Sequence, residues 1–338
     1  MILDIFPHIF PRPFYEAMLK TERAAYMQRR VSAIPVLLDL ELRFRVMDQF
    51  PGYQQVLTMA SPPLEAAGTP ETSPELARIA NDGLAELTSK HPDRFPTFAA
   101  SLPMNNMDAC LKEVDRVVQQ LGARGVQIFS NVNGRPLDDP EFRPLFERMA
   151  AHDLPIWLHP IRGSSFPDYQ TEKKSLHEMW FIFGWPYETT LAMSRMVMAG
   201  MFDEFPNLKV IAHHTGGMVP FFEGRLGPGL DTLGSRTPKD EQDLVKTNIK
   251  GRPLDHFRKF YADTASFGAV GQIVCGMGFF GVDHMLFASD MPFDPEKGPG
   301  FIRETIRAIE AMAIAPADRA KIYEENARRL LKLPKASS

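Results

Sequence analysis

Short apolar runs alternate with longer segments of helical periodicity along almost the whole chain. Eight runs predict strands, at residues 1–8, 53–60, 94–103, 125–130, 155–160, 208–214, 257–266 and 284–290. Most of the intervening segments repeat apolar residues at helical spacing, at residues 73–92, 107–123, 138–153, 189–206 and 267–278. Two further helical segments, 299–313 and 315–333, follow the last strand. The pattern is therefore strand and helix in alternation.

The predicted strands are continuous apolar runs, which is typical of strands buried on both faces. Eight such strands separated by helices favour an α/β fold of the (β/α)8 TIM barrel type over a doubly wound open sheet. Residues 11–50 interrupt the alternation and have helical character, so we expect a helical insertion after the first strand. No linker rich in glycine, serine or proline divides the chain, and we expect a single domain over residues 1–338.

Polar residues stand where four of the apolar runs end. They are His8 after the first run, His159 after the fifth, His214 after the sixth and Asp290 after the eighth. A buried polar side chain is costly unless it is satisfied, and the carboxyl ends of barrel strands form the catalytic face of this architecture. Imidazole and carboxylate groups gathered at such a face are typical ligands of a divalent metal. The sequence therefore predicts a metal-assisted active site.

Composition and charge narrow the function classes. The formal net charge is -4 and no block of Lys or Arg exceeds two residues, so nothing indicates a nucleic-acid surface or a polybasic membrane patch. Cys110 and Cys275 show neither a pairing framework nor metal-site spacing, which suits a reducing compartment. No run approaches the ~18 apolar residues of a membrane span, and the N-terminus lacks the basic region of a signal peptide. We expect a cytoplasmic protein that acts on a small molecule.

Six ordered motifs carry a resemblance to a known family. They are LDxxxH at residues 3–8, LHP at 158–160, GWPxETT at 184–190, HxGGMxPFFxGR at 214–225, YxDTA at 261–265 and SDMPF at 289–293. In this order they resemble the amidohydrolase-related decarboxylases typified by 2-amino-3-carboxymuconate-6-semialdehyde decarboxylase, over nearly the whole length. The resemblance implies an amidohydrolase-like barrel and a carboxy-lyase that acts on an aromatic or conjugated unsaturated carboxylic acid.

The resemblance also implies a ligand set for one metal. The family's site has a HxH pair on the first strand, a histidine on the fifth and an aspartate on the eighth, and His8, His159 and Asp290 match the last three of these ligands. Phe6 stands where the first histidine is expected, and phenylalanine cannot donate to a metal. The metal is therefore expected to bind more weakly than in a site with both histidines. His214 matches the family's catalytic histidine.

The sixth run ends in two adjacent histidines, His213 and His214. Successive strand residues face opposite sides of a sheet, so we expect only one of these rings to point into the barrel. Counting back from the glycine pair of the family motif selects His214 and leaves His213 as a packed or supporting residue. Asp4 and Asp263 either orient neighbouring site groups or make ordinary structural hydrogen bonds.

The resemblance assigns further residues to substrate binding. Arg225 matches an arginine that binds a substrate carboxylate and that reaches into the neighbouring subunit of such enzymes, so a homodimer is implied. An aromatic run containing Trp180, Phe181, Phe183 and Trp185 lies on the connection after the fifth strand, over the catalytic face. Part of it is expected to form an apolar wall for the substrate ring, with Trp180 as the candidate.

The predicted chemistry is a non-oxidative decarboxylation. A divalent metal polarises a substrate oxygen, while His214 or Asp290 supplies or relays the proton that replaces the carboxyl group at carbon. Histidine and aspartate ligands suit zinc and also accommodate manganese. The chain has neither GxGxxG after a strand nor a Walker motif, so no organic cofactor is expected. Two alternatives are a metal-dependent hydrolase or hydratase on the same scaffold, and a metal-free enzyme or binding protein that has lost its ligand at Phe6.

Overall fold

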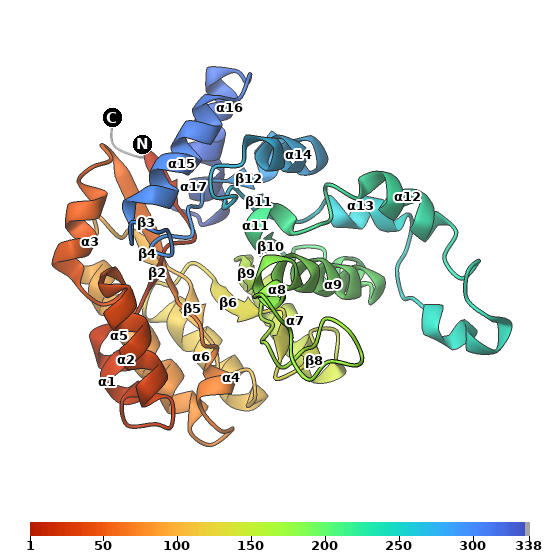
Figure 1. Cartoon of the computed structure of the whole chain (residues 1–338), viewed down its shortest axis with the longest axis horizontal. Helices are drawn as coiled ribbons and strands as arrows, with labels where there is room; N and C mark the ends of the chain where they lie inside the picture. The colour runs from red at the N-terminus through yellow and green to blue at the C-terminus, as the bar shows by residue number, and fades with distance from the viewer. Residues whose placement is uncertain (335–338) are drawn as a thin grey trace.

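The structure, a computed structural model that describes residues 1–334, is a closed ring of parallel strands surrounded by helices (Figure 1). The strands of the ring are β1 (Ile2–Asp4) with β2 (His8–Ile9), β3 (Tyr53–Met59), β4 (Thr97–Phe98) with β5 (Ala100–Ser101), β6 (Val126–Phe129), β9 (Ile156–His159), β10 (Val210–Ala212), β11 (Tyr261–Asp263) and β12 (Met285–Leu286). A small antiparallel hairpin, β7 (Asn131–Val132) and β8 (Arg135–Pro136), follows β6. All eight predicted strand positions are present, and the predicted (β/α)8 barrel is confirmed.

Hydrogen bonds connect the strands around the whole ring. β1 and β2 pair with β3, β3 pairs with β4, and β5, β6, β9, β10, β11 and β12 pair in that order, all in parallel. Between the last strand and the first, Ile5 N donates to Phe287 O at 3.0 Å and His8 N donates to Met291 O at 2.8 Å. The carboxyl ends of all the strands therefore meet at one mouth.

The first and third strands are each divided in two. Pro7 separates β1 from β2 because its nitrogen has no hydrogen to donate to the ladder, although its carbonyl accepts from Thr58 N at 3.2 Å. Ala99 separates β4 from β5 where the chain changes from pairing with β3 to pairing with β6. The break at Pro7 places His8 at the start of a second short strand, beside the end of β3.

Helices cover the outside of the ring (Figure 1). Those between strands are α4 (Leu64–Ala67), α5 (Ser73–Lys90), α6 (Met107–Gln119), α7 (Arg143–His152), α8 (Met179–Ile182), α9 (Gly184–Met198), α10 (Met201–Glu204), α11 (His213–Gly216), α12 (Glu223–Asp231), α13 (Pro253–Phe257) and α14 (Val270–Phe280). The insertion holds α1 (Arg12–Met18), α2 (Ala24–Ala33) and α3 (Leu40–Met47), and the C-terminal part holds α15 (Pro299–Glu310), α16 (Pro316–Ala320) and α17 (Asn326–Leu330). The helix predicted over 189–206 is divided into α9 and α10 by Gly200, whose φ is 75°.

Two apolar cores stabilise the barrel. The smaller one fills the inside of the ring with strand residues such as Leu3, Val56 and Ile211, and residues of α17 pack against its end. Trp157 is the largest side chain within it, and its indole nitrogen donates to Ile5 O at 2.8 Å. The larger core lies between the strands and the surrounding helices. The apolar runs are buried on both faces, which is why they lack polar alternation.

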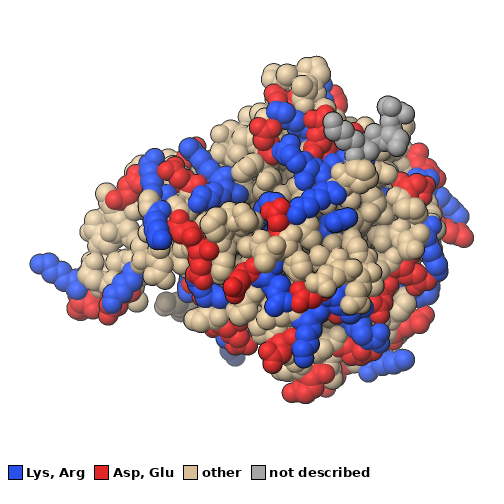
Figure 2. All heavy atoms as spheres, turned by 180° about the vertical axis from the view of Figure 1, so that it is seen from behind, with Lys and Arg blue, Asp and Glu red and all other residues tan. Residues whose placement is uncertain are grey.

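A segment that includes α12 and the short 3-10 helix at Lys239–Val245 projects away from the ring (Figure 1). On the face drawn in Figure 2, Lys and Arg side chains are interspersed with Asp and Glu, without a broad region of one sign. None of the helices in residues 1–334 is long and apolar enough to cross a membrane. Both Cys110 and Cys275 are free, and Cys110 is buried.

Candidate metal centre

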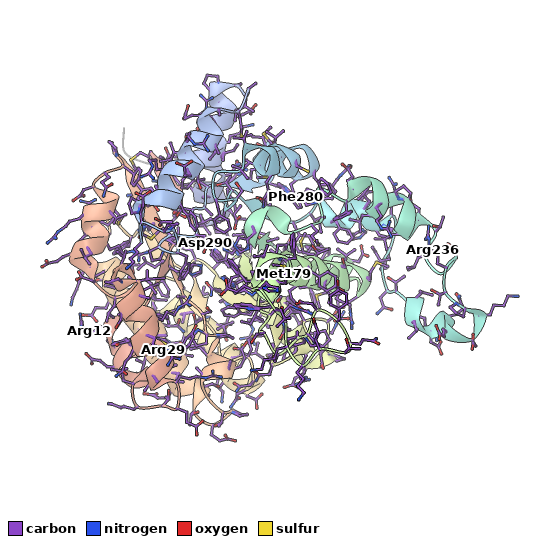
Figure 3. The ribbon with its side chains drawn as sticks, in the orientation of Figure 1. Arg12, Arg29, Met179, Arg236, Phe280 and Asp290 are labelled. Atoms are coloured by element: carbon purple, nitrogen blue, oxygen red, sulfur yellow. The ribbon has the colours of Figure 1, made fainter. Side chains whose placement is uncertain are left out.

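Five ionisable side chains meet at the mouth of the barrel: His8, His159, His213, His214 and Asp290. They come from four strand positions, and all of them are buried. Figure 3 labels Asp290 among the strand ends, with Met179 on the connection after β9 nearby in this view. The structure thus brings together the four residues predicted for the metal and for acid–base chemistry, and adds His213.

His8 is fixed at the mouth by its neighbours on β3. Its Nδ1 lies 3.1 Å from the carbonyl oxygen of Met59 and 3.2 Å from the hydroxyl of Thr58. Its Nε2 lies 3.1 Å from Asp290 Oδ1. The backbone carbonyl of His8 accepts a hydrogen bond from Arg43, a fully buried residue of α3. The insertion therefore helps to position the first strand of the site.

His159 is the last residue of β9 and is oriented by its own chain. Its Nδ1 lies 2.7 Å from the carbonyl oxygen of Pro160. With Nδ1 bonded in this way, the ring presents Nε2 to the cluster. The centroids of the His159 and His8 rings lie 5.3 Å apart. The rings of Trp185 and Phe129 pack at 5.4 Å and 5.0 Å from it.

His213 and His214 both reach the site, so the expectation that strand alternation turns one of them away is wrong. β10 ends at Ala212, and His214 has a left-handed φ of 54°, so the two rings do not follow the geometry of an extended strand. His213 Nδ1 bonds the carboxylate of Asp263, and its Nε2 lies 3.6 Å from Asp290 Oδ1. His214 Nε2 lies 3.5 Å from the other oxygen, Asp290 Oδ2.

Asp290 is the carboxylate around which the imidazoles gather. Burial raises the pKa of Asp290, but the adjacent imidazoles of His213, His214 and His8 outweigh burial and hold this pKa well below its usual range. Its φ of 63° is left-handed, a conformation that costs a residue of this kind about 1–3 kcal/mol and is concentrated at functional sites. The site therefore holds an ionised carboxylate in a strained backbone position.

The two candidate supporting carboxylates lie next to this cluster. Asp263 is bonded to His213, as described, and also accepts from Thr215 N at 3.2 Å. Asp4 accepts from the hydroxyl of Ser289, the residue before Asp290, and from Phe6 N at 3.1 Å. Asp263 thus holds His213, which contacts the site, and Asp4 holds Ser289, which precedes Asp290.

The protonation states of the imidazoles differ. Burial lowers the pKa of His8, His159 and His214, so these rings are neutral at neutral pH and can donate a lone pair. Burial acts in the same direction on His213, but the carboxylates of Asp263 and Asp290 outweigh it and raise its pKa to about 9. A metal that uses His213 Nε2 must displace that proton.

Two overlapping groups of side chains could each hold a divalent metal, and His213 belongs to both. The ligand nitrogens of His8, His159 and His213 lie within 4.8 Å of one another. The ligand atoms of His213, His214 and Asp290 also lie within 4.8 Å of one another. Zinc holds nitrogen ligands at about 2.0–2.1 Å, which places tetrahedral ligands about 3.4 Å apart. The Nε2 atoms of His8 and His213 are buried and have no hydrogen-bond partner within residues 1–334. Unpartnered buried nitrogens beside an ionised carboxylate are the donor set that a metal needs.

Phe6 faces this cluster, as its position in the first strand predicts. Its side chain is fully buried, and its ring stacks on His213 with centroids 3.8 Å apart and an interplanar angle of 18°. The His8 and His159 rings lie 5.6 Å and 5.9 Å away. Phe6 therefore contributes an apolar wall to the site and no ligand.

The predicted substrate-binding residues lie at different distances from the cluster. Trp185 packs against His159 and donates from its indole nitrogen to Arg162 O at 3.1 Å. Trp180 is one ring further out, with its centroid 6.1 Å from that of Trp185. Arg225 lies on α12, is exposed, and stands apart from the cluster.

Two residues that sequence reasoning missed lie close to the mouth. The Phe293 ring is 5.4 Å from that of His8, and the Arg30 guanidinium carbon lies 4.8 Å from the Phe293 ring centroid. Arg30 donates to Tyr26 at 3.2 Å, and its buried Nε has no partner within the described residues. Periodicity places Arg30 on an insertion helix, α2, but nothing in the sequence pattern tells that this helix reaches the mouth.

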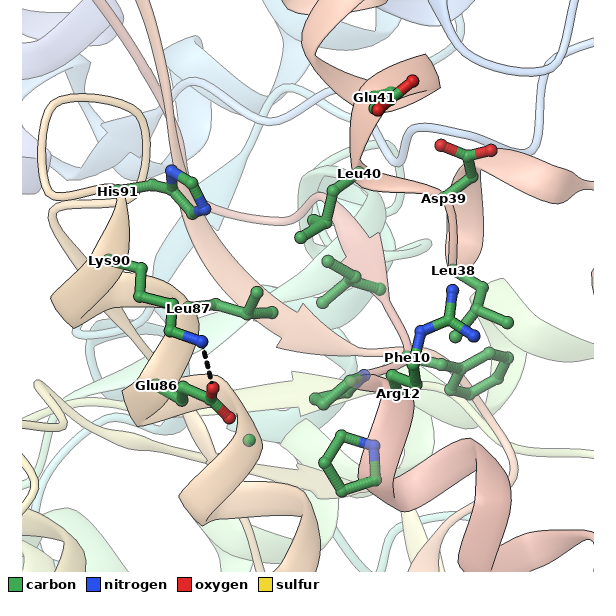
Figure 4. Close-up of a pocket in the computed structure, with 14 residues that line it drawn as sticks. Phe10, Arg12, Leu38, Asp39, Leu40, Glu41, Glu86, Leu87, Lys90 and His91 are labelled. Atoms are coloured by element: carbon green, nitrogen blue, oxygen red, sulfur yellow. Dashed lines mark hydrogen bonds and ion pairs between the residues drawn. The ribbon is translucent and has the colours of Figure 1, made fainter.

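A cleft of about 530 Å³ lies outside the ring, between the insertion and α5 (Figure 4). It is lined by charged residues of both signs, and Lys90 and Glu86 pair across one helical turn. None of its residues belongs to the groups that could hold a metal in the described chain. The candidate chemistry therefore lies at the mouth, and not in this cleft.

Comparison with known proteins identifies the family of the chain. Residues 38–333 match the amidohydrolase family. The chain is 32% identical over 310 residues to the gamma-resorcylate decarboxylase of a Rhizobium species, covering 88% of each chain. It is 33% identical over 197 residues to 2-amino-3-carboxymuconate-6-semialdehyde decarboxylase of Dictyostelium discoideum, covering 58% of this chain and 50% of that protein.

A solved structure with a similar fold is dihydroxybenzoic acid decarboxylase from Polaromonas sp. JS666, with bound manganese and the inhibitor 2-nitroresorcinol. It superimposes with a TM-score of 0.81 at 27% identity and covers 99% of this chain and 98% of its own. The similarity therefore extends over the whole barrel, including the strand that carries Phe6 and His8.

Proposed function

The chain belongs to the amidohydrolase family, and we propose that it is a metal-dependent non-oxidative decarboxylase of an aromatic carboxylic acid. The gamma-resorcylate decarboxylase and dihydroxybenzoate decarboxylase that it resembles support an aromatic substrate with a hydroxyl group beside the carboxylate. No organic cofactor is required, because a metal and protein side chains can supply the chemistry.

One observation carries the proposal: the two oxygens of Asp290 face different imidazoles. Oδ1 lies 3.1 Å from His8 Nε2 and Oδ2 lies 3.5 Å from His214 Nε2. The carboxylate can thus bind a metal on one side and share a proton with His214 on the other. His8, His159 and Asp290 are the proposed metal ligands, and His214 and Asp290 form the proposed acid–base pair.

When bound, the metal would polarise an oxygen of the substrate. The residues of this chain then have three tasks: to orient the ring, to hold the carboxylate and to move a proton. Burial keeps His214 neutral, so its imidazole can accept a proton from the substrate and return it to the ring carbon. As the carbon–carbon bond breaks, its electron pair stays on the ring carbon and takes up that proton, and CO2 leaves.

Substrate contacts come from the mouth and from a second subunit. Trp185 and Phe293 offer aromatic surfaces beside His159 and His8, and Trp180 extends the surface outward. Arg30, with its buried unpartnered Nε, is a proposed anchor for a carboxylate or a phenolate.

Arg225 is proposed to serve the site of a partner subunit in a homodimer. It lies on α12, beside the projecting segment, and is exposed there. Large apolar side chains of residues 221–245 are also exposed, including Phe221 at 78% and Leu244 at 76%. Exposed apolar groups of this size on one region support a protein–protein contact, and a second copy of the chain is the partner that the family resemblance implies.

One metal per chain is proposed, as zinc or manganese. Manganese in the Polaromonas structure supports the second ion, whereas a cluster rich in imidazole favours zinc. The test is to remove metal with a chelator, reload the protein with Zn²⁺ or Mn²⁺, and measure CO2 release from 2,6-dihydroxybenzoate and related acids. We expect activity only after reloading. Hydrolysis of an ester or amide without CO2 release, or turnover that survives metal removal, would contradict the proposal.

A further inference from the structure

Phe6 and His213 form a pair at the centre of the site. Phe6 occupies the place of a metal-binding histidine in the family pattern, and its ring is stacked directly on His213, 3.8 Å away. His213 is fully buried under the mouth and extends toward Asp290 Oδ1. The ring that cannot bind a metal is therefore in contact with an additional imidazole that can.

The hydrogen bonds of the imidazoles separate His213 from His214. Metal-binding histidines almost always donate their second ring N–H to a carbonyl or carboxylate, which fixes the tautomer and the orientation of the ring. His8, His159 and His213 all satisfy this rule: their Nδ1 atoms bond Met59 O, Pro160 O and the Asp263 carboxylate.

His214 does not satisfy it. Its Nδ1 is buried and has no hydrogen-bond partner within residues 1–334. Three imidazoles are thus held with Nε2 toward the cluster, and the fourth lacks the support that a ligand usually has.

The two oxygens of Asp290 lead to the same division. The Nε2 atoms of His8 and His213 lie 3.1 Å and 3.6 Å from Asp290 Oδ1, on either side of the about 3.4 Å expected between tetrahedral zinc ligands. His214 approaches Oδ2, the other oxygen of the same carboxylate. His213 therefore shares the ligand side of Asp290 with His8, and His214 lies on the other side.

We propose that His213 replaces the imidazole missing at position 6, so that His8, His159, His213 and Asp290 hold the metal and His214 remains free for proton transfer. The Asp263 carboxylate then positions His213 as a ligand. This inference rests on the proposed function only in that the chain must bind a divalent metal.

The first test is metal affinity, measured by competition with a chelator for Zn²⁺ and for Mn²⁺. His213→Gln should lower metal affinity by about a hundredfold or more, because the loss of a ligand should cost at least as much affinity as the loss of a residue that supports a ligand. The adjacent variant His214→Ala is the matched control and should retain affinity within about threefold, because it removes no ligand. Equal losses in the two variants, or no loss in His213→Gln, would overturn the inference.

The second test exchanges the two positions. The double variant Phe6→His/His213→Gln should bind the metal at least about tenfold more tightly than His213→Gln, because it restores an imidazole at the position where the family pattern has one. Phe6→His alone should gain little, because the ligand set is already complete. A large gain in the single variant with no recovery in the double variant would contradict the exchange.

X-ray absorption of the zinc-loaded protein gives a readout that is independent of activity and of the His213 variants. The inference requires three imidazoles on the metal, both in the unaltered protein and in His214→Ala. Two imidazoles in His214→Ala would show that His213 is not a ligand while leaving the proposed function intact. Failure of the proposed function gives a different result: the unaltered protein would bind no stoichiometric metal, or would bind metal without releasing CO2 from a hydroxybenzoate.

Discussion

At the scale of single residues, the contacts of His214 differ from those of the other imidazoles. It faces Asp290 Oδ2, it is 7% exposed, and its ring lies 6.4 Å from Trp185 and 5.7 Å from Phe267. It thus lies beside two aromatic rings, one of which, Trp185, also packs against His159. Its pKa, lowered by burial, suits a base that is neutral before the substrate arrives.

We predict that His214→Ala lowers kcat by about a hundredfold or more, as expected for a general acid–base residue. Metal content, measured by mass spectrometry of the native protein, should stay near that of the unaltered chain. Near-normal turnover in this variant would remove His214 from the mechanism. Loss of metal together with activity would instead make it a ligand.

Glu65 is a further buried ionisable group and is not one of the proposed ligands. It lies on α4 with 5% of its surface exposed, and its Oε1 has no partner within the described chain. Burial raises its pKa from 4.5 to about 8. Between these values the folded protein keeps a proton that the unfolded chain releases. The stability conferred by the neutral carboxyl is therefore full below pH 4.5 and declines as the pH rises toward 8.

We predict that Glu65→Gln stabilises the protein above pH 5 and that the gain grows up to pH 8, by at most about 1.4 kcal/mol per pH unit. Thermal unfolding at pH 4, 6 and 8 measures it. At pH 4 the two proteins should unfold at similar temperatures. Glu147→Gln, at an exposed position of α7, is the control and should show no such dependence. A constant difference at all three pH values would contradict the assigned pKa.

At the scale of elements, strands were predicted better than their ends. The apolar runs identify all eight strand positions because burial on both faces leaves a direct mark on the sequence. The end of β10 could not be predicted, because the left-handed conformation of His214 depends on contacts with β11 and Asp290. Strand alternation, which predicts that His213 turns away from the site, therefore does not apply there.

The sequence predicts the convergence of the proposed ligands better than the surroundings of the candidate site. His8, His159 and Asp290 converge because parallel strands end at one mouth. Arg30 could not be found, because the place of an inserted helix depends on tertiary packing and not on periodicity. The choice between Trp180 and Trp185 had the same difficulty, since both lie on a connection whose path has no sequence period.

The connection after β9 gives a prediction at this scale. Trp185→Ala should raise KM by about tenfold, since an aromatic contact and its buried area are worth about 1–2 kcal/mol, while kcat falls less. Trp180→Ala should have a smaller effect, because its ring is further from His159. Phe183→Ala, on the same connection but 62% exposed, is the control. Steady-state kinetics would contradict this arrangement if Trp180 were the more sensitive position.

At the scale of the whole molecule, a single barrel on its own gives no role to the projecting segment. Figure 3 labels Arg236 on this segment, well away from Asp290 in the ring. Its exposed apolar residues and the exposed Arg225 beside it support the proposed contact with a second copy. If Arg225 completes the partner's site, each site contains residues of two chains.

Mixed dimers test this sharing. Arg225→Ala and His214→Ala should each be nearly inactive alone. After the two are unfolded together and reassembled, about a quarter of the normal activity should return, because half of the dimers are mixed and each mixed dimer has one complete site. Reassembly of Arg225→Ala with unaltered chain serves as the control for recovery. Absence of any gain in the mixture would place Arg225 in its own subunit's site or outside both.

The proposed function requires that a carboxyl group be replaced by a proton at carbon, without an oxidant. The most direct measurement is turnover of a hydroxybenzoate by the metal-loaded protein in D2O without oxygen. We predict one CO2 per product molecule and one deuterium at the carbon that carried the carboxyl group. Product without deuterium at that carbon, or no CO2 from any hydroxybenzoate despite stoichiometric metal, would contradict it.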